Sequence, residues 1–397
     1  MATTSPTFPR ELLERPWNER IHYFQTYTMA HPKLVTAREA LQNAIHEVPQ
    51  NSLIFVFGPT GVGKTTLRVK VEQELTAEMV SVLKEDPTRL PVVSVECIAP
   101  ESGSFSWRDH FRRLLLEIEE PLVDYKIDHE APVRTPVVRF MPSAKAVGAE
   151  YHHAVERALA YRRPTAVLVD EAQHLARMGS GRRLSDQLDV IKSLANRTKT
   201  VHVLIGTYEL LAFRNLSGQL SRRSVDIHFL RYRTEDPTDI KAFRTILRSF
   251  EQQLPVAHPP DLVNEWEYLY ERTIGCVGVL KDWLLRALVS ASRRDASALT
   301  VQDLQTHALS VAQCDEMLAE SLGGENNLSE TTEASNRLRA RLGLSPNGGR
   351  QDHSAEDEAS SPSPRPARRS NPKPGQRRPI RDPVGIPEAL YANADSI

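Results

Sequence analysis

The pattern of apolar and polar positions predicts a chain in which short buried strands alternate with amphipathic helices. Five short runs are rich in branched and aromatic apolar residues, as expected for strands buried on both faces of a parallel sheet. These runs cover residues 53–57, 91–97, 166–169, 201–206 and 225–230. Helical spacing of apolar residues marks the segments 67–79, 107–119, 148–161 and 185–196 between them. The alternation predicts an α/β fold with a five-stranded parallel sheet core.

The pattern also divides the chain into four parts. Residues 1–47 form an N-terminal extension, in which the apolar positions between Leu34 and Ile45 predict an amphipathic helix. Residues 48–233 form the α/β domain. Four amphipathic segments then predict a small helical lid over residues 234–322; they are 238–253, 261–272, 279–291 and 300–309.

The last part, residues 323–397, is predicted to be a disordered tail rich in Pro and Arg. Its composition turns to Ser, Pro, Gly and charge, which is typical of segments that cannot bury a core. Leu338, Leu342 and Leu344 predict one short helical turn, and residues 346–381 are the most clearly disordered by composition. Such a tail either serves as a tether or contacts DNA or a partner protein.

The segment after the first predicted strand matches the phosphate-binding pattern G-x-x-x-x-G-K-[ST] over residues 58–65. Its glycines let backbone N–H groups face phosphate oxygens, and the N-terminus of the next helix adds partial positive charge. Lys64 supplies a charge for the β- and γ-phosphates, and the Thr65 hydroxyl is placed to bind Mg²⁺. The pattern therefore predicts binding of a nucleoside triphosphate such as ATP. The predicted binding residues are Gly58, Pro59, Thr60, Gly61, Val62, Gly63, Lys64, Thr65 and Thr66.

Two carboxylates end the third predicted strand, at Asp170 and Glu171. On their own they would favour a solvated strand end. Together with the phosphate-binding pattern they indicate a Walker B element, in which Asp170 holds Mg²⁺ and Glu171 polarises the attacking water. Thr207 ends the fourth predicted strand, where it either senses the γ-phosphate or only closes a turn. This combination predicts ATP hydrolysis.

Composition fits a cytoplasmic ATPase. The chain has 397 residues, enough for two or three folded units, and its net charge is −1. Any affinity for nucleic acid must therefore come from local basic patches. The three cysteines, at 97, 276 and 314, are scattered and indicate neither a disulfide framework nor a metal cluster. No segment reads as a signal peptide or a membrane span, so no membrane partner is expected.

Four strings of residues make the resemblance to a known family specific. They are Gly-Pro-Thr-Gly-Val-Gly-Lys-Thr-Thr66, Val-Asp-Glu-Ala-Gln-His-Leu175, Leu-Ile-Gly-Thr207 and Gln-Leu-Ser-Arg-Arg223. Together they resemble AAA+ ATPases over residues 31–313. Within that group the Asp-Glu-Ala-Gln-His-Leu string and the aromatic-basic run at residues 105–115 are most similar to the TnsC/TniB regulators of DNA transposition.

The resemblance implies an AAA+ P-loop NTPase fold and a slow, assembly-stimulated ATPase. It also implies a ring or helical homo-oligomer on double-stranded DNA, which links a target-selector protein to a DDE transposase. Thr207 would be the sensor 1 residue. Either Arg222 or Arg223 would be the arginine finger that reaches a neighbour's γ-phosphate, and the sequence does not choose between them.

The sequence departs from the pattern of many AAA+ lids at one position. Where a nucleotide-contacting Arg often stands three residues after a Gly, the string Gly275-Cys-Val-Gly278 has glycine. Lys281 or Arg286 are the candidates to replace that contact.

The sequence leaves alternatives open both for the DNA-contacting residues and for the function of the protein. The basic residues considered for the DNA backbone are Arg108, Arg112, Arg113, Lys192, Arg197 and Lys199; each fits a solvated helix face equally well. The alternative functions are a nucleotide-switch signalling ATPase and a helicase-loader or secretion-type ATPase.

Overall fold

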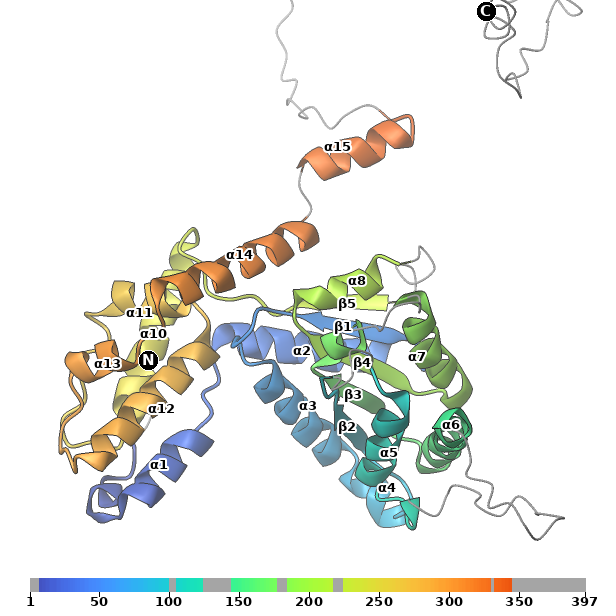
Figure 1. Cartoon of the computed structure of the whole chain (residues 1–397), viewed down its shortest axis with the longest axis horizontal. Helices are drawn as coiled ribbons and strands as arrows, with labels where there is room; N and C mark the ends of the chain where they lie inside the picture. The colour runs from blue at the N-terminus through green and yellow to red at the C-terminus, as the bar shows by residue number, and fades with distance from the viewer. Residues whose placement is uncertain are drawn as a thin grey trace, which may run out of the picture. The chain divides into compact units, whose positions relative to one another are not determined.

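The computed structural model describes residues 7–99, 105–123, 144–176, 184–216, 224–329 and 332–344. The chain divides into two compact units, Met1–Glu330 and Thr331–Ile397. The second unit contains one described helix, α15 (Thr332–Arg341). The first unit contains the sheet and the remaining described helices (Figure 1).

Five parallel strands form the sheet, in the order β2-β3-β4-β1-β5. Their bounds are β1 Leu53–Phe57, β2 Val92–Glu96, β3 Ala166–Asp170, β4 Val201–Gly206 and β5 Ser224–His228. In β1, β3 and β4 every residue is buried, which explains why these runs lack the alternation of a half-exposed strand. Because all strands run the same way, the loops after β1, β3 and β4 meet at one edge of the sheet.

Helices cover both faces of the sheet (Figure 1). Alternate strand residues point to each face. On one face α2 (Pro32–Glu47) and α3 (Lys64–Glu78) pack against Ile54 and Val56 of β1. On the other face Phe55 and Phe57 of β1 face a core formed with four helices. These are α5 (Trp107–Glu117), α6 (Ala144–Arg162), α7 (Leu184–Thr198) and α8 (Leu211–Arg214). The short helix α4 (Val80–Glu85) follows α3.

A second hydrophobic core holds the helices that follow β5. They are α10 (Pro237–Gln253), α11 (Trp266–Thr273), α12 (Val277–Arg293) and α13 (Val301–His307). α13 begins with the predicted capping box, in which the Thr300 and Asp303 side chains bond each other's backbone N–H. α1 (Trp17–Thr26) belongs to this core through Phe24, although 26 residues of chain separate its end from β1. The sequence did not predict α1.

Helix α14 (Val311–Leu328) joins this helical core to the α/β domain. A Cβ on Gly324 would lie 2.0 Å from the ring of Tyr208, which begins the 3₁₀ helix η4 (Tyr208–Leu210). One residue further on, Glu325 forms a buried ion pair with Arg231, 2.9 Å between Oε1 and Nε. The helix therefore continues past residue 323, the predicted start of the tail. It does so because Gly324 packs against Tyr208 and Glu325 pairs with Arg231.

Two adjacent glycines in α14 should respond oppositely to substitution. Gly324→Ala should destabilise the fold by about 1–3 kcal/mol, because its methyl group would collide with the Tyr208 ring. Gly323→Ala meets nothing within 4 Å and should stabilise the helix by up to about 1 kcal/mol. Urea unfolding of both variants measures this difference. Equal midpoints for the two would contradict the packing of α14 on Tyr208.

The fold class predicted from the sequence is confirmed: the sheet is parallel and five-stranded, and a helical lid follows it. The predicted single turn near residue 338 lies in the longer helix α15. The stretch predicted to be most disordered, residues 346–381, lies outside the described residues. None of the described helices combines the length and apolarity needed to cross a lipid bilayer.

Candidate functional site: the carboxyl edge of the sheet

The phosphate-binding loop, residues 58–65, runs from β1 into α3. Gly61 and Gly63 have φ angles of +75° and +111°, which favour glycine over residues with a side chain. Lys64 is buried, and its Nζ donates hydrogen bonds to the carbonyls of Gly58 (3.0 Å) and Pro59 (2.9 Å). Burial lowers the pKa of Lys64, and the nearby carboxylates of Glu171 and Asp170 oppose that shift. The loop thus holds its cation against its own carbonyl groups.

Asp170 and Arg68 form an ion pair beside the loop. Asp170 ends β3 and is buried, and its Oδ2 lies 3.2 Å from Nε of Arg68 on α3. Its Oδ1 accepts a hydrogen bond from the backbone N–H of Glu171 (3.0 Å). Arg68 also pairs with Glu72 one turn later (3.0 Å), so the guanidinium is held between two carboxylates. Sequence reasoning assigned no role to Arg68.

Glu171 and Thr207 are linked by the side chain of Gln173. Glu171 has φ +51°, unusual for a residue with a side chain, and begins the turn into the 3₁₀ helix η3 (Ala172–Ala176). The Gln173 Nε2 donates to Glu171 Oε2 at 2.5 Å, and its Oε1 accepts from the Thr207 N–H at 3.2 Å. The Thr207 hydroxyl oxygen is buried and has no hydrogen-bond partner. A buried polar atom of this kind is expected to gain a partner when a ligand binds.

The donor set fits Mg²⁺ held in the usual way for a nucleotide site. Mg²⁺ takes one or two protein oxygens and completes its shell with water and phosphate oxygens. Thr65 is exposed in the first turn of α3, and Asp170 is the acidic residue beside it at the end of β3. Within the described part of the chain no group of three or more His, Cys, Asp or Glu side chains could hold a metal by itself.

The lid contacts the phosphate-binding loop through backbone atoms. The Val279 N–H at the start of α12 donates to the Gly61 carbonyl (3.2 Å). A Cβ on Gly278 would lie 2.5 Å from the same oxygen, so the approach requires glycine at that position. This explains why position 278 does not carry the Arg found in many AAA+ lids. Of the two candidates to replace it, Arg286 donates to the His307 carbonyl (3.4 Å), and Lys281 lines the pocket beside the loop while its Nζ donates to the Gln25 carbonyl (2.8 Å).

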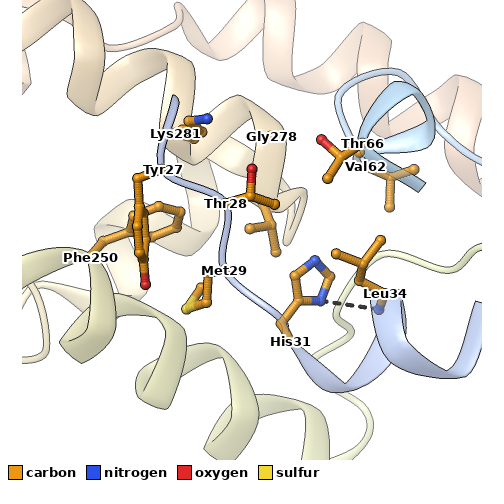
Figure 2. Close-up of a pocket in the computed structure, with 12 residues that line it drawn as sticks. Tyr27, Thr28, Met29, His31, Leu34, Val62, Thr66, Phe250, Gly278 and Lys281 are labelled. Carbon is orange, nitrogen blue, oxygen red and sulfur yellow. Dashed lines mark hydrogen bonds between the residues drawn. The ribbon is translucent and has the colours of Figure 1, made fainter. Parts of the chain in front are cut away.

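That pocket lies between the N-terminal extension, the loop and α12 (Figure 2). Tyr27, Met29 and His31 come from the segment between α1 and α2, and Thr66 and Lys281 face it from α3 and α12. Burial lowers the pKa of His31 to about 4, so its ring is neutral and Nδ1 accepts from the Leu34 N–H (3.3 Å). The pocket adjoins the phosphate-binding loop, which contributes Val62 and Gly63 to its lining.

Residues 48–213 match the family described as an AAA domain. This segment, 166 of the 397 residues, therefore resembles an AAA domain. The match spans β1 to β4 and includes the phosphate-binding loop, Asp170, Glu171 and Thr207. Together with the five-stranded parallel sheet, the match shows an AAA+ P-loop NTPase fold, and the phosphate-binding loop within it supports nucleotide binding. No curated protein matches the chain.

Three solved structures resemble the chain at low identity. The ORC2 protein of Aeropyrum pernix, solved as ADPNP–ADP complexes, has 13% identity and a TM-score of 0.48, and the match covers 84% of this chain and 87% of that one. The Walker-type ATPase PABY2304 of Pyrococcus abyssi has 17% identity and a TM-score of 0.37, with 77% and 76% covered. Drosophila ORC bound to DNA has 15% identity and a TM-score of 0.42, with 87% and 77% covered.

The structure separates the six basic residues considered for DNA. The Trp107 indole donates to Gln187, so α5 and α7 begin side by side at the carboxyl edge of the sheet, near Arg108. Arg197 lies ten residues after Gln187 on α7, about 15 Å further along its axis, and Lys199 follows the end of the helix. The six are therefore spread over α5, α7 and the turn after α7. Three of them are paired with acids: Arg113 with Asp109 (2.6 Å), Lys192 with Asp189 (3.2 Å) and Arg197 with Glu156 (2.9 Å).

Arg222 and Arg223, the candidates for the arginine finger, lie outside the described residues. Among the described residues, sequence reasoning missed Arg68, Gln173, the backbone contact from α12 and the pocket wall at Tyr27–His31. Gln173 carried a signal, since it lies within the Asp-Glu-Ala-Gln-His-Leu string. The other contacts join segments far apart in the chain, and no local pattern marks them.

Proposed function

We propose that the AAA domain hydrolyses ATP at the carboxyl edge of the sheet. The observation that carries this proposal is the placing of Lys64, Asp170, Glu171 and Thr207 at the ends of three adjacent strands, β1, β3 and β4. Glu171 accepts the proton of the attacking water, and Lys64 leaves its loop carbonyls for the β- and γ-phosphates. The unpartnered Thr207 hydroxyl donates to the γ-phosphate. Asp170 and Thr65 would hold Mg²⁺, which would neutralise phosphate charge when bound.

We further propose that the protein regulates DNA transposition. In this proposal ATP-bound copies assemble on double-stranded DNA and link a target-selector protein to a DDE transposase. The Asp-Glu-Ala-Gln-His-Leu string and the aromatic-basic run at residues 105–115, which are similar to TnsC/TniB regulators, support it, as does the exposed position of Arg108 and Arg113 on α5. Arg222 or Arg223 of one copy would complete the ATP site of its neighbour, and the tail would reach the partner proteins.

ATP-dependent binding to duplex DNA tests this function. The protein should bind unrelated duplexes cooperatively with ATP or a slowly hydrolysed analogue, because assembly and phosphate contacts need no base recognition. Affinity should fall steeply between about 50 and 200 mM salt, since backbone contacts release counterions. Arg108→Gln should flatten the logarithmic salt dependence by about one unit. Fluorescence anisotropy with labelled duplexes measures these quantities.

Three variants serve as controls. Arg244→Gln, an exposed Arg on α10, should leave the salt dependence unchanged. The double variant Arg222→Ala/Arg223→Ala should bind ATP but lose cooperative DNA binding. A chain ending at Glu330 retains the first compact unit, with α14 packed on Tyr208, and should still bind DNA. If binding is instead independent of ATP and is lost in that shortened chain, the tail holds DNA, and a nucleotide switch or helicase loader becomes the better interpretation.

A further inference from the structure

Gln173 contacts both ends of the proposed catalytic arrangement. Its carboxamide is buried, with 5% of the residue exposed, and lies between the Glu171 carboxylate and the backbone of Thr207. Glu171 belongs to the loop after β3, whereas Thr207 follows β4. The Gln173 side chain therefore connects the loop after β3 to the loop after β4 through its two hydrogen bonds.

The orientation of the Gln173 amide is determined by its partners. A backbone N–H can only donate, so the Thr207 N–H requires the carbonyl oxygen Oε1 on its side. An ionised carboxylate can only accept, so Glu171 requires the NH₂ group on the other side. Both contacts select the same orientation, and a flipped amide would lose both. Only an uncharged side chain with one donor and one acceptor satisfies this pair of neighbours.

The neighbouring strand leaves room for this side chain. A Cβ on Gly206 would lie 2.5 Å from Oε1 of Gln173 and 3.2 Å from its backbone nitrogen. Gly206 does not have a positive φ, so its backbone conformation would accept other residues. The absence of a side chain at the end of β4 is explained by the space that the Gln173 carboxamide occupies.

We propose that Gln173 is a positioning residue, which holds the Glu171 carboxylate in a fixed relation to Thr207. One carboxylate oxygen of Glu171 accepts from Gln173, and the other remains for the attacking water. The same amide also holds the backbone of Thr207. The distance between the water-polarising carboxylate and a γ-phosphate bound by the Thr207 hydroxyl is therefore kept constant. This inference rests on the proposed ATPase function, and it adds a role for a residue within the Walker B string.

Replacing Gln173 with glutamate tests the proposal. The variant keeps an acceptor for the Thr207 N–H but places a second carboxylate against Glu171, which repels it from its position. At about pH 8, kcat should fall about 10- to 100-fold, as expected when a catalytic group is displaced by about 1 Å. The dissociation constant for ATP should change less than about threefold, because Gln173 is not expected to touch the nucleotide. Gln173→Met, which removes both hydrogen bonds at similar length, should also lower kcat and serves if the glutamate variant does not fold.

A double-mutant cycle distinguishes positioning from a structural role. In a Glu171→Gln background the Gln173→Glu substitution should cost no further activity, because the group that it positions is already lost. Gln187→Glu is the matched control, because Gln187 is also a buried glutamine. Its hydrogen bond is with the Trp107 indole rather than with Glu171 or Thr207, so the kcat of this variant should be unchanged. Independent losses that multiply in the double variant, or a normal kcat in both Gln173 variants, would overturn the inference while leaving the ATPase function standing. Normal hydrolysis in Glu171→Gln would instead overturn the proposed mechanism itself.

Discussion

Glu171→Gln is expected to slow ATP hydrolysis by about a hundredfold or more while leaving ATP binding nearly unchanged. Glutamine keeps the size of the side chain but cannot accept the proton of the attacking water. Glu171 follows β3, outside the phosphate-binding loop, and its Oε2 accepts a hydrogen bond from Gln173 (2.5 Å). The substitution should therefore leave the phosphate-binding loop intact. Single-turnover hydrolysis, together with nucleotide affinity from a fluorescent ATP analogue, separates the two effects.

Two further variants make this measurement specific. Glu209→Gln removes a carboxylate two residues after Thr207 and should hydrolyse ATP at the normal rate. Lys64→Ala should weaken ATP binding itself, because it removes the cation that the loop holds at Gly58 and Pro59. Wild-type turnover in Glu171→Gln would remove Glu171 from the mechanism.

Stability should fall steeply as the pH drops from about 6.5 to 4. Burial lowers the pKa of His110 and of His202 to about 4, and the His202 ring lowers the pKa of His110 further. The unfolded chain has histidine pKa values near 6.5, so as pH falls it binds protons before the folded protein does. Protonation therefore favours unfolding within this window. Each histidine should contribute about 2 kcal/mol of lost stability between pH 7 and pH 5.

Urea unfolding at pH 7, 6 and 5 measures this effect. His202→Asn removes one titrating group and can still donate to the Thr200 carbonyl, which the histidine Nδ1 contacts at 3.0 Å. Whatever its stability at pH 7, its loss between pH 7 and 5 should be smaller than that of the wild type by about 2 kcal/mol. His153→Asn is the control, because its side chain is 60% exposed. Parallel pH curves for the wild type and His202→Asn would rule out this origin.

Much of the fold was predictable because its signals are local. The buried strands β1, β3 and β4 appear as short uninterrupted apolar runs, and α10 and α12 show clear helical spacing. α1 and α14 were missed for physical reasons. α1 is short, and its Phe24 is buried by lid helices that come more than two hundred residues later. α14 contains Gly323 and Gly324, which lower helix propensity and suggest a tail.

The candidate site divides in the same way. The phosphate-binding loop and the acidic pair after β3 were proposed from contiguous strings, because a strand, a glycine turn and a helix start must follow one another in the chain. The Arg68–Asp170 pair and the bridge through Gln173 were not proposed. The first joins α3 to β3 across about a hundred residues, and the second depends on the distance between two neighbouring strand ends.

The sequence by itself determined the class of fold and the kind of ligand, because hydrophobic period and the glycine-lysine string act over a few residues. The tertiary structure decided how the site is closed. Only folding brings the Val279 N–H onto the Gly61 carbonyl, which requires glycine at 278, and packs α14 against the residue that follows Thr207. Such contacts depend on side chains and backbone atoms from distant segments meeting within a few ångströms, and the spacing of residues along the chain does not record those distances.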